Sequence, residues 1–264
     1  MYKFNYQRPE TVEEAIALFK AGEDPKFISG GMTLLPTMKL RLAQPSDLID
    51  LNAVAGFAGI AATEDTITIG AGTRHAEVAA SEVVSGLIPG LAHLADSIGD
   101  PQVRNRGTIG GSIANNDPAA DYPAAVLGLN ATVVTDRREI KADDYFLGIF
   151  ETALEPDEVV VAVRFPVPKR AGYTKFPNPA SRYAIVGVMV AECSDGIRVA
   201  VTGAGACVFR MAEMEAALAN DFSADAIKAL RCDPDELNED IHASAEYRAH
   251  LVGVMAQRAV DAAG

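Results

Sequence analysis

Two glycine-rich stretches carry the residue types in this chain that are suited to binding chemistry. The longer one, residues 107–123, combines two adjacent glycines with small polar side chains and two aspartates. Adjacent glycines allow a sharp turn and close approach to a ligand, and consecutive N–H groups in such a turn form a concave anion site. Asp117 and Pro118 suit an N-cap and a first helical residue, so we expect an alanine-rich helix from there to about Leu129. The stretch predicts a loop that holds a phosphate-bearing ligand, with a simple tight loop as the alternative.

A second stretch, residues 26–36, repeats this order of features. An apolar segment leads to Gly30 and Gly31, a hydroxyl side chain follows at Thr33, and a helix is expected from residue 34. Two loops of the same kind at separate places in the chain can face each other across one pyrophosphate. Together they predict a single ligand site with two walls.

Composition narrows the class of protein. Hydrophobic residues make up 49% of the 264 residues, which predicts a globular chain with a sizeable core. The net charge of −13 argues against a nucleic-acid or anionic membrane surface, because phosphate groups attract Lys and Arg. The three cysteines form no Cys-x-x-Cys pair and are too few for an iron–sulfur cluster, which usually needs four thiolates. We expect no metal site, no membrane-spanning segment and, without a leader, a cytoplasmic location.

Other polar residues are weaker candidates. The segment 70–75 follows an expected strand with a Gly-x-Gly pattern, but it lacks the third glycine of a dinucleotide fingerprint. We therefore expect His75 to be a polar loop or cap residue and His93 to be an ordinary helix residue. Arg104 and Arg106 could steady phosphates or a partner's acidic surface, or could belong to a solvated loop.

The elements around these loops fall into three parts. In residues 1–55, Thr11 and Glu14 form a capping box that starts a helix, and Gly22 ends it. The order there is β-α-β-α-β, with strands at 3–6, 26–29 and 48–51 and a second helix at 34–42. In residues 56–168 we expect a hairpin of 60–62 with 66–69, then strands at 131–135 and 158–165. After a linker at 166–172, three strands (173–176, 184–193 and 197–204) precede three helices (210–219, 224–230 and 243–262), which suggests a separate α+β domain.

The two loops, taken together, resemble a known family. The motifs are Ser29-Gly30-Gly31-Met32-Thr33-Leu34-Leu35-Pro36 with Lys39-Leu40-Arg41-Leu42, and Thr108-Ile109-Gly110-Gly111-Ser112 with Asn115 through Asp121. Their order and spacing are similar to those of the FAD-binding medium subunit of molybdenum hydroxylases, as in aerobic carbon monoxide dehydrogenase, and of the homologous flavin domain of xanthine dehydrogenase. The resemblance covers nearly the whole chain.

The resemblance implies an α+β fold in three parts. Residues 1–55 and 56–168 would be the two subdomains of a vanillyl-alcohol-oxidase-like FAD-binding domain. Residues 173–264 would be the C-terminal α+β domain, a three-stranded antiparallel sheet with a helical bundle.

The resemblance also implies which residues bind FAD. Both glycine loops would donate backbone N–H groups to the pyrophosphate, Asn115 and Asp121 would hydrogen-bond the cofactor, and Tyr183 would shield one face of the isoalloxazine ring. Val160 or Val161 would lie near the adenine or the ring, and Lys175 near the flavin. The implied contacts of the two loops are Lys26, Phe27, Ile28, Ser29, Gly30, Gly31, Met32, Thr33 and Leu34, and then Thr108, Ile109, Gly110, Gly111 and Ser112.

Some positions depart from the family pattern. The usual first loop has Ala, two glycines, Gln or His, and Ser, whereas this chain has Ser29 at the start, then Met32 and Thr33. Thr33 keeps the hydroxyl, but Met32 removes a polar side chain. Neither loop contains histidine, so we expect FAD to be held without a covalent bond. The cysteine-ligated cluster insertion of the hydroxybenzoyl-CoA reductase branch is absent.

By resemblance, the chain is an electron-transfer subunit of a larger enzyme. A molybdopterin-binding large subunit would oxidise the substrate, and a [2Fe–2S] small subunit would pass electrons to this FAD, in a dimer of heterotrimers. NAD, a quinone or oxygen would then accept them. No residue of this chain is predicted to be catalytic toward the substrate. The alternatives are a self-sufficient FAD-dependent oxidoreductase of the same fold and a nucleotide-binding scaffold without redox activity.

Overall fold

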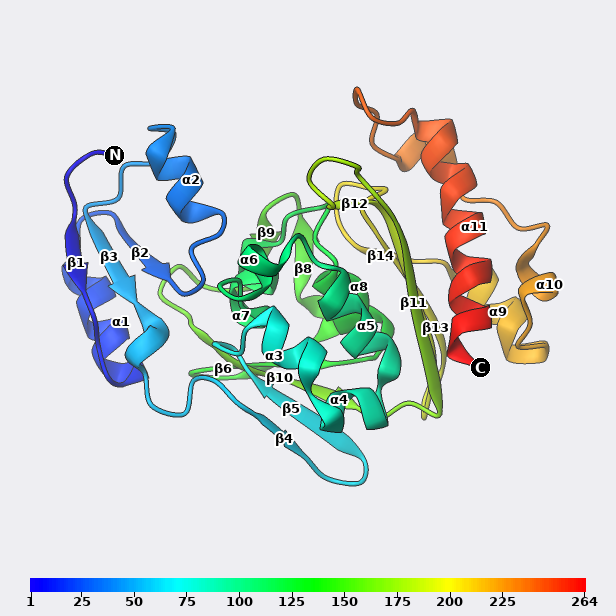
Figure 1. The fold of residues 1–264 in the computed structure, drawn as a ribbon, viewed down its shortest axis with the longest axis horizontal. Coiled ribbons are helices and arrows are strands. Elements are labelled where there is room, and N and C mark those ends of the chain that lie inside the picture. Colours follow the sequence, from blue (N-terminus) through cyan, green and yellow to red (C-terminus); the bar gives the residue numbers. More distant parts are fainter.

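Three lobes follow one another along the long axis of the molecule (Figure 1). They are seen in a computed structural model that describes all residues, 1–264. The N-terminal lobe lies at one end, the C-terminal sheet and its helices lie at the other, and the middle lobe joins them. The division of the chain at residues 55 and 168 remains a prediction, but the elements group in this order.

The N-terminal lobe is a small parallel sheet with helices. Its strands, in the order β1-β3-β2, are β1 (Asn5–Gln7), β2 (Pro25–Ile28) and β3 (Asp47–Asp50). Its helices are α1 (Val12–Ala21), α2 (Leu34–Lys39) and the 3₁₀ turn η1 (Leu51–Ala53). Thr11 caps α1 as predicted, because its hydroxyl accepts the N–H of Glu14 at 3.1 Å. Helix α2 ends before residue 42, since Arg41 has a left-handed backbone with φ of 61°.

The middle lobe is a five-stranded antiparallel sheet in the order β4-β5-β10-β6-β7, covered by short helices. Its strands are β4 (Ile60–Ala62), β5 (Thr66–Gly70), β6 (Thr132–Thr135), β7 (Glu139–Lys141) and β10 (Val160–Pro166), with a separate pair β8 (Phe146–Gly148) and β9 (Glu151–Thr152). Its helices are α3 (His75–Ala80), α4 (Glu82–Leu87), α5 (Pro89–Ser97), α6 (Pro101–Arg104), α7 (Ile109–Asn115), α8 (Tyr122–Gly128) and η2 (Ala142–Asp144). The hairpin of β4 with β5 confirms the pattern in the sequence.

The long glycine stretch folds differently from the prediction. Asp117 and Pro118 do not open a helix. Instead, Thr108 caps α7, which contains both glycines of the pair, and α7 ends at Asn116 in a left-handed conformation. The side-chain amide of Asn116 donates to the carbonyls of Gly148 and Glu151, which holds this turn in place. A new helix, α8, begins only at Tyr122. The stretch is therefore two helices joined by a loop.

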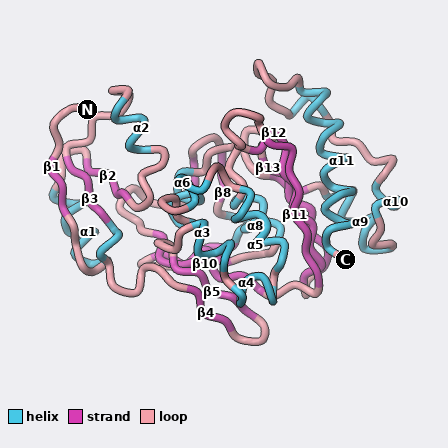
Figure 2. Tube along the Cα trace, viewed as in Figure 1, coloured by secondary structure: helices cyan, strands magenta, loops and turns pink.

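The C-terminal lobe is an antiparallel sheet between two layers of helices. Its strands, in sheet order, are β11 (Arg170–Pro177), β12 (Ala184–Cys193), β13 (Gly196–Thr202) and a short fourth strand, β14 (Phe209–Arg210). Its helices are α9 (Ala212–Asn220), α10 (Ala224–Ile227), η3 (Pro234–Glu236) and α11 (Ala245–Ala263). Helices α9 and α11 pack on one face, whereas α5 and α8 of the middle lobe contact the same sheet (Figure 2).

Strand β12 shows how the lobes are joined. Alternate residues of a strand point to opposite faces of the sheet. Val186, Val188 and Val190 belong to the core beneath α11, whereas Met189 and Ala191 belong to the core of the middle lobe. This explains the almost continuously apolar sequence of β12, and it means that the C-terminal lobe shares part of its core with the middle lobe. Strand β11 also begins at Arg170, inside the predicted linker.

Candidate functional site

A pocket of about 570 Å³ is lined by residues from all three lobes. This volume lies in the range of cofactor sites, about 300–1,000 Å³. Most of the residues predicted to bind a cofactor line it, from both glycine loops, Asn115, Asp121, Val160 and Tyr183. Ile109, Val161 and Lys175 do not line it. The two loops thus form one site, as the sequence predicted.

The first loop presents free hydrogen-bond donors to the pocket. None of the backbone N–H groups from Ser29 to Leu34 has an acceptor within the chain. Gly31 has φ of +71°, a conformation that favours glycine and turns the loop back toward α2. A run of unpaired N–H groups in a turn attracts an anion. This loop therefore has the unpaired donors that an anion site needs, and its role as an anion site stays a prediction.

The second loop differs from the prediction, because its donors already have partners. The N–H groups of Ile109 and Gly110 donate to the carbonyls of Thr73 and Ala71, at 3.1 and 2.9 Å. Those of Gly111 and Ser112 donate to the hydroxyl and the carbonyl of Thr108. The expectation that this loop offers N–H groups to a pyrophosphate is therefore wrong for these four residues. The start of α7 is held instead by the turn after β5.

The two glycines of α7 have different surroundings. A Cβ atom on Gly110 would lie 2.5 Å from the Cβ of Ala71, so this glycine allows α7 to contact the turn. A Cβ atom on Gly111 would meet only the Thr108 hydroxyl, at 3.0 Å. Gly111 lines the pocket, and the space in front of it is otherwise open. Gly110 is thus required for packing, whereas Gly111 leaves room for a ligand.

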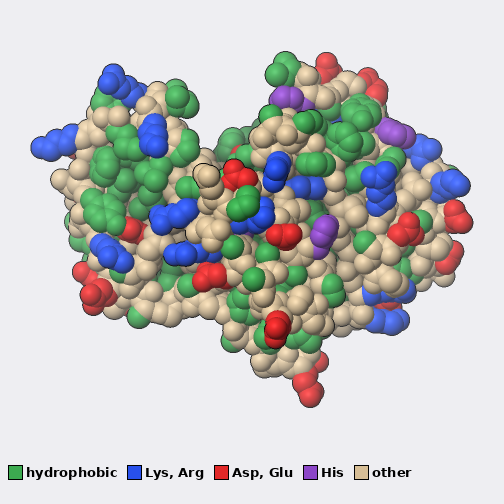
Figure 3. Space-filling model, viewed as in Figure 1, with side chains coloured by type: hydrophobic (Ala, Val, Ile, Leu, Met, Phe, Trp, Pro, Cys, Tyr) green, Lys and Arg blue, Asp and Glu red, His purple; other side chains and the backbone are tan.

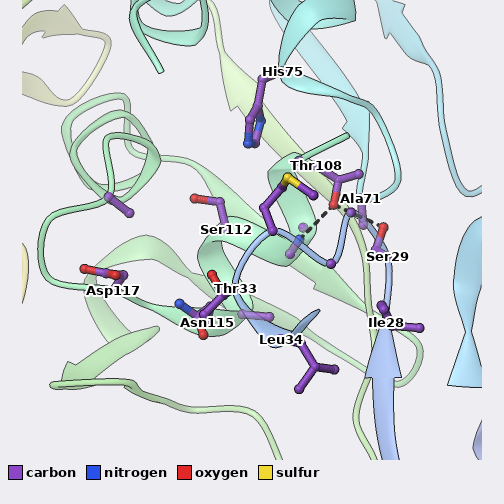
Figure 4. A pocket seen from close by; sticks show the side chains of 18 of the residues that line it. Ile28, Ser29, Thr33, Leu34, Ala71, His75, Thr108, Ser112, Asn115 and Asp117 are labelled. Carbon is purple, nitrogen blue, oxygen red and sulfur yellow. Dashed lines mark hydrogen bonds between the residues drawn. The ribbon is translucent and has the colours of Figure 1, made fainter. Parts of the chain in front are cut away.

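Direct contacts join the two loops into one wall. The hydroxyl of Thr108 donates to that of Ser29 at 3.1 Å (Figure 4). A Cβ atom on Gly30 would lie 2.4 Å from the carbonyl oxygen of Arg106, so the backbones touch at this glycine. The first loop is held against the start of α7, and the N-terminal and middle lobes meet at the pocket.

A buried ion pair lies behind one end of the pocket. Asp121 lines the pocket, is 4% exposed and accepts a hydrogen bond from the Tyr173 hydroxyl. The Nζ atom of Lys175 is 2.9 Å from Asp121 Oδ1 and also donates to the carbonyl of Arg182 at 2.9 Å. Burial raises the pKa of Asp121 despite the opposing charge of Lys175. Lys175 therefore supports the pocket from behind and holds the backbone next to Tyr183.

Of the two valines that the sequence offered as cofactor contacts, one lies at the apolar end of the pocket. Val160 is buried and lines the pocket with Leu34 and Leu154. Val161 follows it on β10, where the strand has a bulge, and does not line the pocket. Of these two valines, only Val160 is therefore placed to contact a ligand in the pocket.

Sequence reasoning missed His75 as a pocket residue. It lies at the start of α3, is 5% exposed and lines the pocket, whereas a polar loop or cap was expected (Figure 4). Burial and the charge of Arg104 lower the pKa of His75 to about 4, so the ring is neutral at pH 7. The signal in the sequence was the Gly-x-Gly pattern of 70–72, which begins at the last residue of β5. This pattern is no dinucleotide fingerprint, but its Ala71 contacts Gly110 of α7.

The remaining polar candidates lie outside the pocket. Arg104 donates to the carbonyls of Ile98 and Gly99, and Arg106 is exposed. His93 is an exposed residue of α5, in line with the expectation of an ordinary helix residue. The structure contains no cluster of three His, Cys, Asp or Glu residues that could hold a metal ion, and none of its helices is long and apolar enough to cross a bilayer.

Comparison with known proteins identifies the family. Residues 2–168 match the family described as "FAD binding domain in molybdopterin dehydrogenase". The carbon monoxide dehydrogenase medium chain of Hydrogenophaga pseudoflava is 37% identical, over 99% of this chain and 97% of the relative. The nicotine 6-hydroxylase medium subunit of Paenarthrobacter nicotinovorans is also 37% identical, over 98% of this chain and 96% of the relative.

Solved structures agree with these relatives. A chain of carbon monoxide dehydrogenase from Hydrogenophaga pseudoflava superposes with a TM-score of 0.90 at 39% identity, and the match covers 99% of this chain and 97% of that one. The match spans all three lobes, including the C-terminal sheet that lies beyond residue 168. The chain therefore belongs to the family of FAD-binding domains of molybdopterin dehydrogenases, which are oxidoreductases.

Proposed function

We propose that the chain is the FAD-binding electron-transfer subunit of a molybdenum hydroxylase complex. The observation that carries this proposal is the run of free N–H groups from Ser29 to Leu34, at a pocket of cofactor size. A pyrophosphate supplies the negatively charged acceptors that such donors need. The open space in front of Gly111 supports the same fit.

The residues of the pocket would bind and orient the cofactor. Bound FAD would supply the redox chemistry, and the protein would supply its binding, orientation and electrostatics. The Ser29–Leu34 backbone would hold the pyrophosphate, and the hydroxyls of Ser29 and Thr108 would keep the two loops together. The end lined by Leu34, Leu154 and Val160 would hold the adenine. Tyr183, which is 45% exposed, would cover one face of the flavin ring.

The two buried carboxylates at the pocket offer a self-sufficient enzyme no free general acid or base, whereas the third, Asp117, is partly exposed and is bonded only to the N–H of Ala119. A general acid or base must be free to exchange a proton with a substrate. Asp121 is engaged by Lys175 and Tyr173, and Glu158 is engaged by Arg138 and Thr135. Both buried carboxylates therefore hold the structure together.

The relatives support a role inside a larger complex. They are named as a medium chain and a medium subunit, and their names give different substrates, carbon monoxide and nicotine. Equal identity to both is expected if this chain serves the flavin while another chain recognises the substrate. The partners would be a molybdopterin-binding large subunit and a [2Fe–2S] small subunit, in a dimer of heterotrimers.

The electron acceptor and location complete the proposal. We infer that NAD, a quinone or oxygen accepts the electrons, and that the complex works in the cytoplasm. All three cysteines are free thiols, as is usual in a reducing compartment. Assays of the complex with each acceptor in turn would identify the acceptor.

Purification of the full chain, alone and with its partners, tests the function. We expect a flavin absorption band and co-purification with subunits that contain molybdopterin and [2Fe–2S] centres. A colourless chain that fails to bind added FAD would contradict the proposal and support the alternative of a scaffold without redox activity. An isolated yellow chain that oxidises a small substrate without partners would favour the self-sufficient enzyme.

A further inference from the structure

His75 has unused hydrogen-bonding capacity at the pocket. Its Nδ1 atom is fully buried and has no hydrogen-bond partner, whereas Nε2 is not among the fully buried atoms and makes no hydrogen bond to another side chain. A neutral imidazole carries one N–H donor and one acceptor nitrogen. A buried polar group without a partner is costly, so such groups are rare in folded proteins.

The packing around His75 explains why the chain itself offers no partner. Gly107 lies against the ring, and a Cβ atom there would come within 2.5 Å of Nε2. The Tyr122 ring is 5.3 Å away and tilted by 48°, and its own hydroxyl is also without a partner. The two groups differ in one respect, because His75 lines the pocket and Tyr122 does not.

The position of His75 relates it to the proposed cofactor. Figure 4 shows its ring directed toward Thr108 and Ser112, on the wall formed by α7. Ile98, Gly99 and Gly107 line the pocket beside it. Arg182 donates to the carbonyl of Gly99 at 3.3 Å, so this part of the pocket adjoins the segment that carries Tyr183.

We propose that His75 is a positioning residue whose Nε2–H donates a hydrogen bond to an acceptor of the bound dinucleotide. The inference rests on the proposed function, because it takes FAD as the ligand. The acceptor is an oxygen or nitrogen atom, either of the flavin or of a phosphate. Because Nδ1 is fully buried, Nε2 is the ring nitrogen that would make this bond.

Titration of FAD into the full-length apoprotein tests this inference. In His75→Phe, which keeps a ring but removes the donor, we expect FAD to bind roughly tenfold more weakly, as for the loss of one buried hydrogen bond. The melting temperature of the apoprotein should stay the same or rise, because an unpaired polar group has been removed. His75→Gln should recover part of the affinity.

Tyr122→Phe is the matched control, since it removes the neighbouring unpaired group that does not line the pocket. Its affinity for FAD should equal that of the wild type. Titration of His75→Phe with ADP then locates the acceptor. If only FAD binds more weakly, the acceptor is an atom of the flavin. If both FAD and ADP bind more weakly, the acceptor is a phosphate oxygen.

Two results would overturn the inference. One is an unchanged affinity of His75→Phe for FAD, and the other is an equal loss in Tyr122→Phe, which would indicate a structural role for the pair. Failure of the wild-type chain to bind FAD would instead contradict the proposed function itself.

Discussion

Gly110 and Gly111 are neighbours in the sequence but face different surroundings. Gly110 is pressed against the backbone of Ala71, whereas Gly111 faces the pocket. Sequence patterns treat the two glycines alike, because both belong to the same motif. Only the folded chain shows which of them a ligand could contact.

We predict that Gly111→Val binds FAD at least about tenfold more weakly while the apoprotein stays folded, because the side chain would fill space in front of the loop. Gly110→Val should instead destabilise the fold, since its side chain would collide with backbone atoms. Fluorescence titration and thermal melting separate the two effects. Gly86→Val, at an open position on α4, is the control. Retention of full affinity in Gly111→Val would contradict this placement.

Lys175 shows how a side chain can support a site without lining it. Its charge is paired with Asp121, and both side chains are almost fully buried. Removing one partner of such a pair leaves an unpaired buried charge, which costs about 3–5 kcal/mol.

We therefore predict that Lys175→Met lowers the free energy of unfolding by about that amount. The double variant Lys175→Met/Asp121→Asn should recover a large part of the loss, because neither charge is then left alone. Urea denaturation of the apoproteins measures both values. Equal stability of the single and double variants would argue against coupling of the pair.

At the scale of elements, a turn between two strands is tied to the start of β10. The Glu158 carboxylate accepts hydrogen bonds from Thr135, from two nitrogens of Arg138 and from the N–H of Glu155. The bonds to Arg138 outweigh burial and lower the pKa of Glu158 to about 2. This contact joins the β6–β7 turn to the segment that leads to Val160.

The lowered pKa predicts a pH dependence. The folded state favours the charged carboxylate, so its contribution is present above the ordinary pKa of about 4.5 and is lost as the pH falls toward 2. Glu158→Gln should lower stability by about 2 kcal/mol at pH 7, and the difference from the wild type should shrink over that range. Urea melts across pH measure it. Glu139→Gln, in an exposed pair with Arg164, should have a smaller effect, and a constant difference for Glu158→Gln would oppose the assignment.

At the scale of the whole molecule, apolar side chains gather on the surface of the N-terminal lobe, with Lys and Arg around them (Figure 3). Leu40 and Leu42 are 71% and 75% exposed, and Met32 is partly exposed on the same loop and helix. Met32, which precedes α2, also lines the pocket, whereas Leu40 and Leu42 follow this helix. Because an electron donor must come close to the flavin, we expect the proposed [2Fe–2S] subunit to contact this exposed surface.

We predict that Leu40→Ser/Leu42→Ser still binds FAD but no longer retains the [2Fe–2S] subunit during co-purification, because burial of the two side chains would drive the contact. Ile241→Ser is the control, since Ile241 is 95% exposed on the C-terminal lobe. Flavin content and the bands that co-purify report the two properties. Assembly at the wild-type level would show that another face binds this subunit.

The local pattern of the chain was enough to predict many elements. Thr11 with Glu14 predicted the start of α1, the alternation in 60–69 predicted a hairpin, and the apolar run 184–193 predicted β12. These signals depend on neighbouring residues, so they survive in any tertiary context that buries the apolar side chains. Two glycine loops in the right order were likewise enough to predict a shared pocket.

Other features depended on residues far apart in the chain. The free donors proved to belong to the first loop, because Ala71 and Thr73 occupy the N–H groups at the start of α7. Tertiary contact also brought His75 to the pocket wall and placed Lys175 behind Asp121. The sequence by itself predicted the two glycine loops that line the pocket. Only the tertiary structure decided which of their hydrogen bonds remain available, since that depends on acceptors supplied by distant segments.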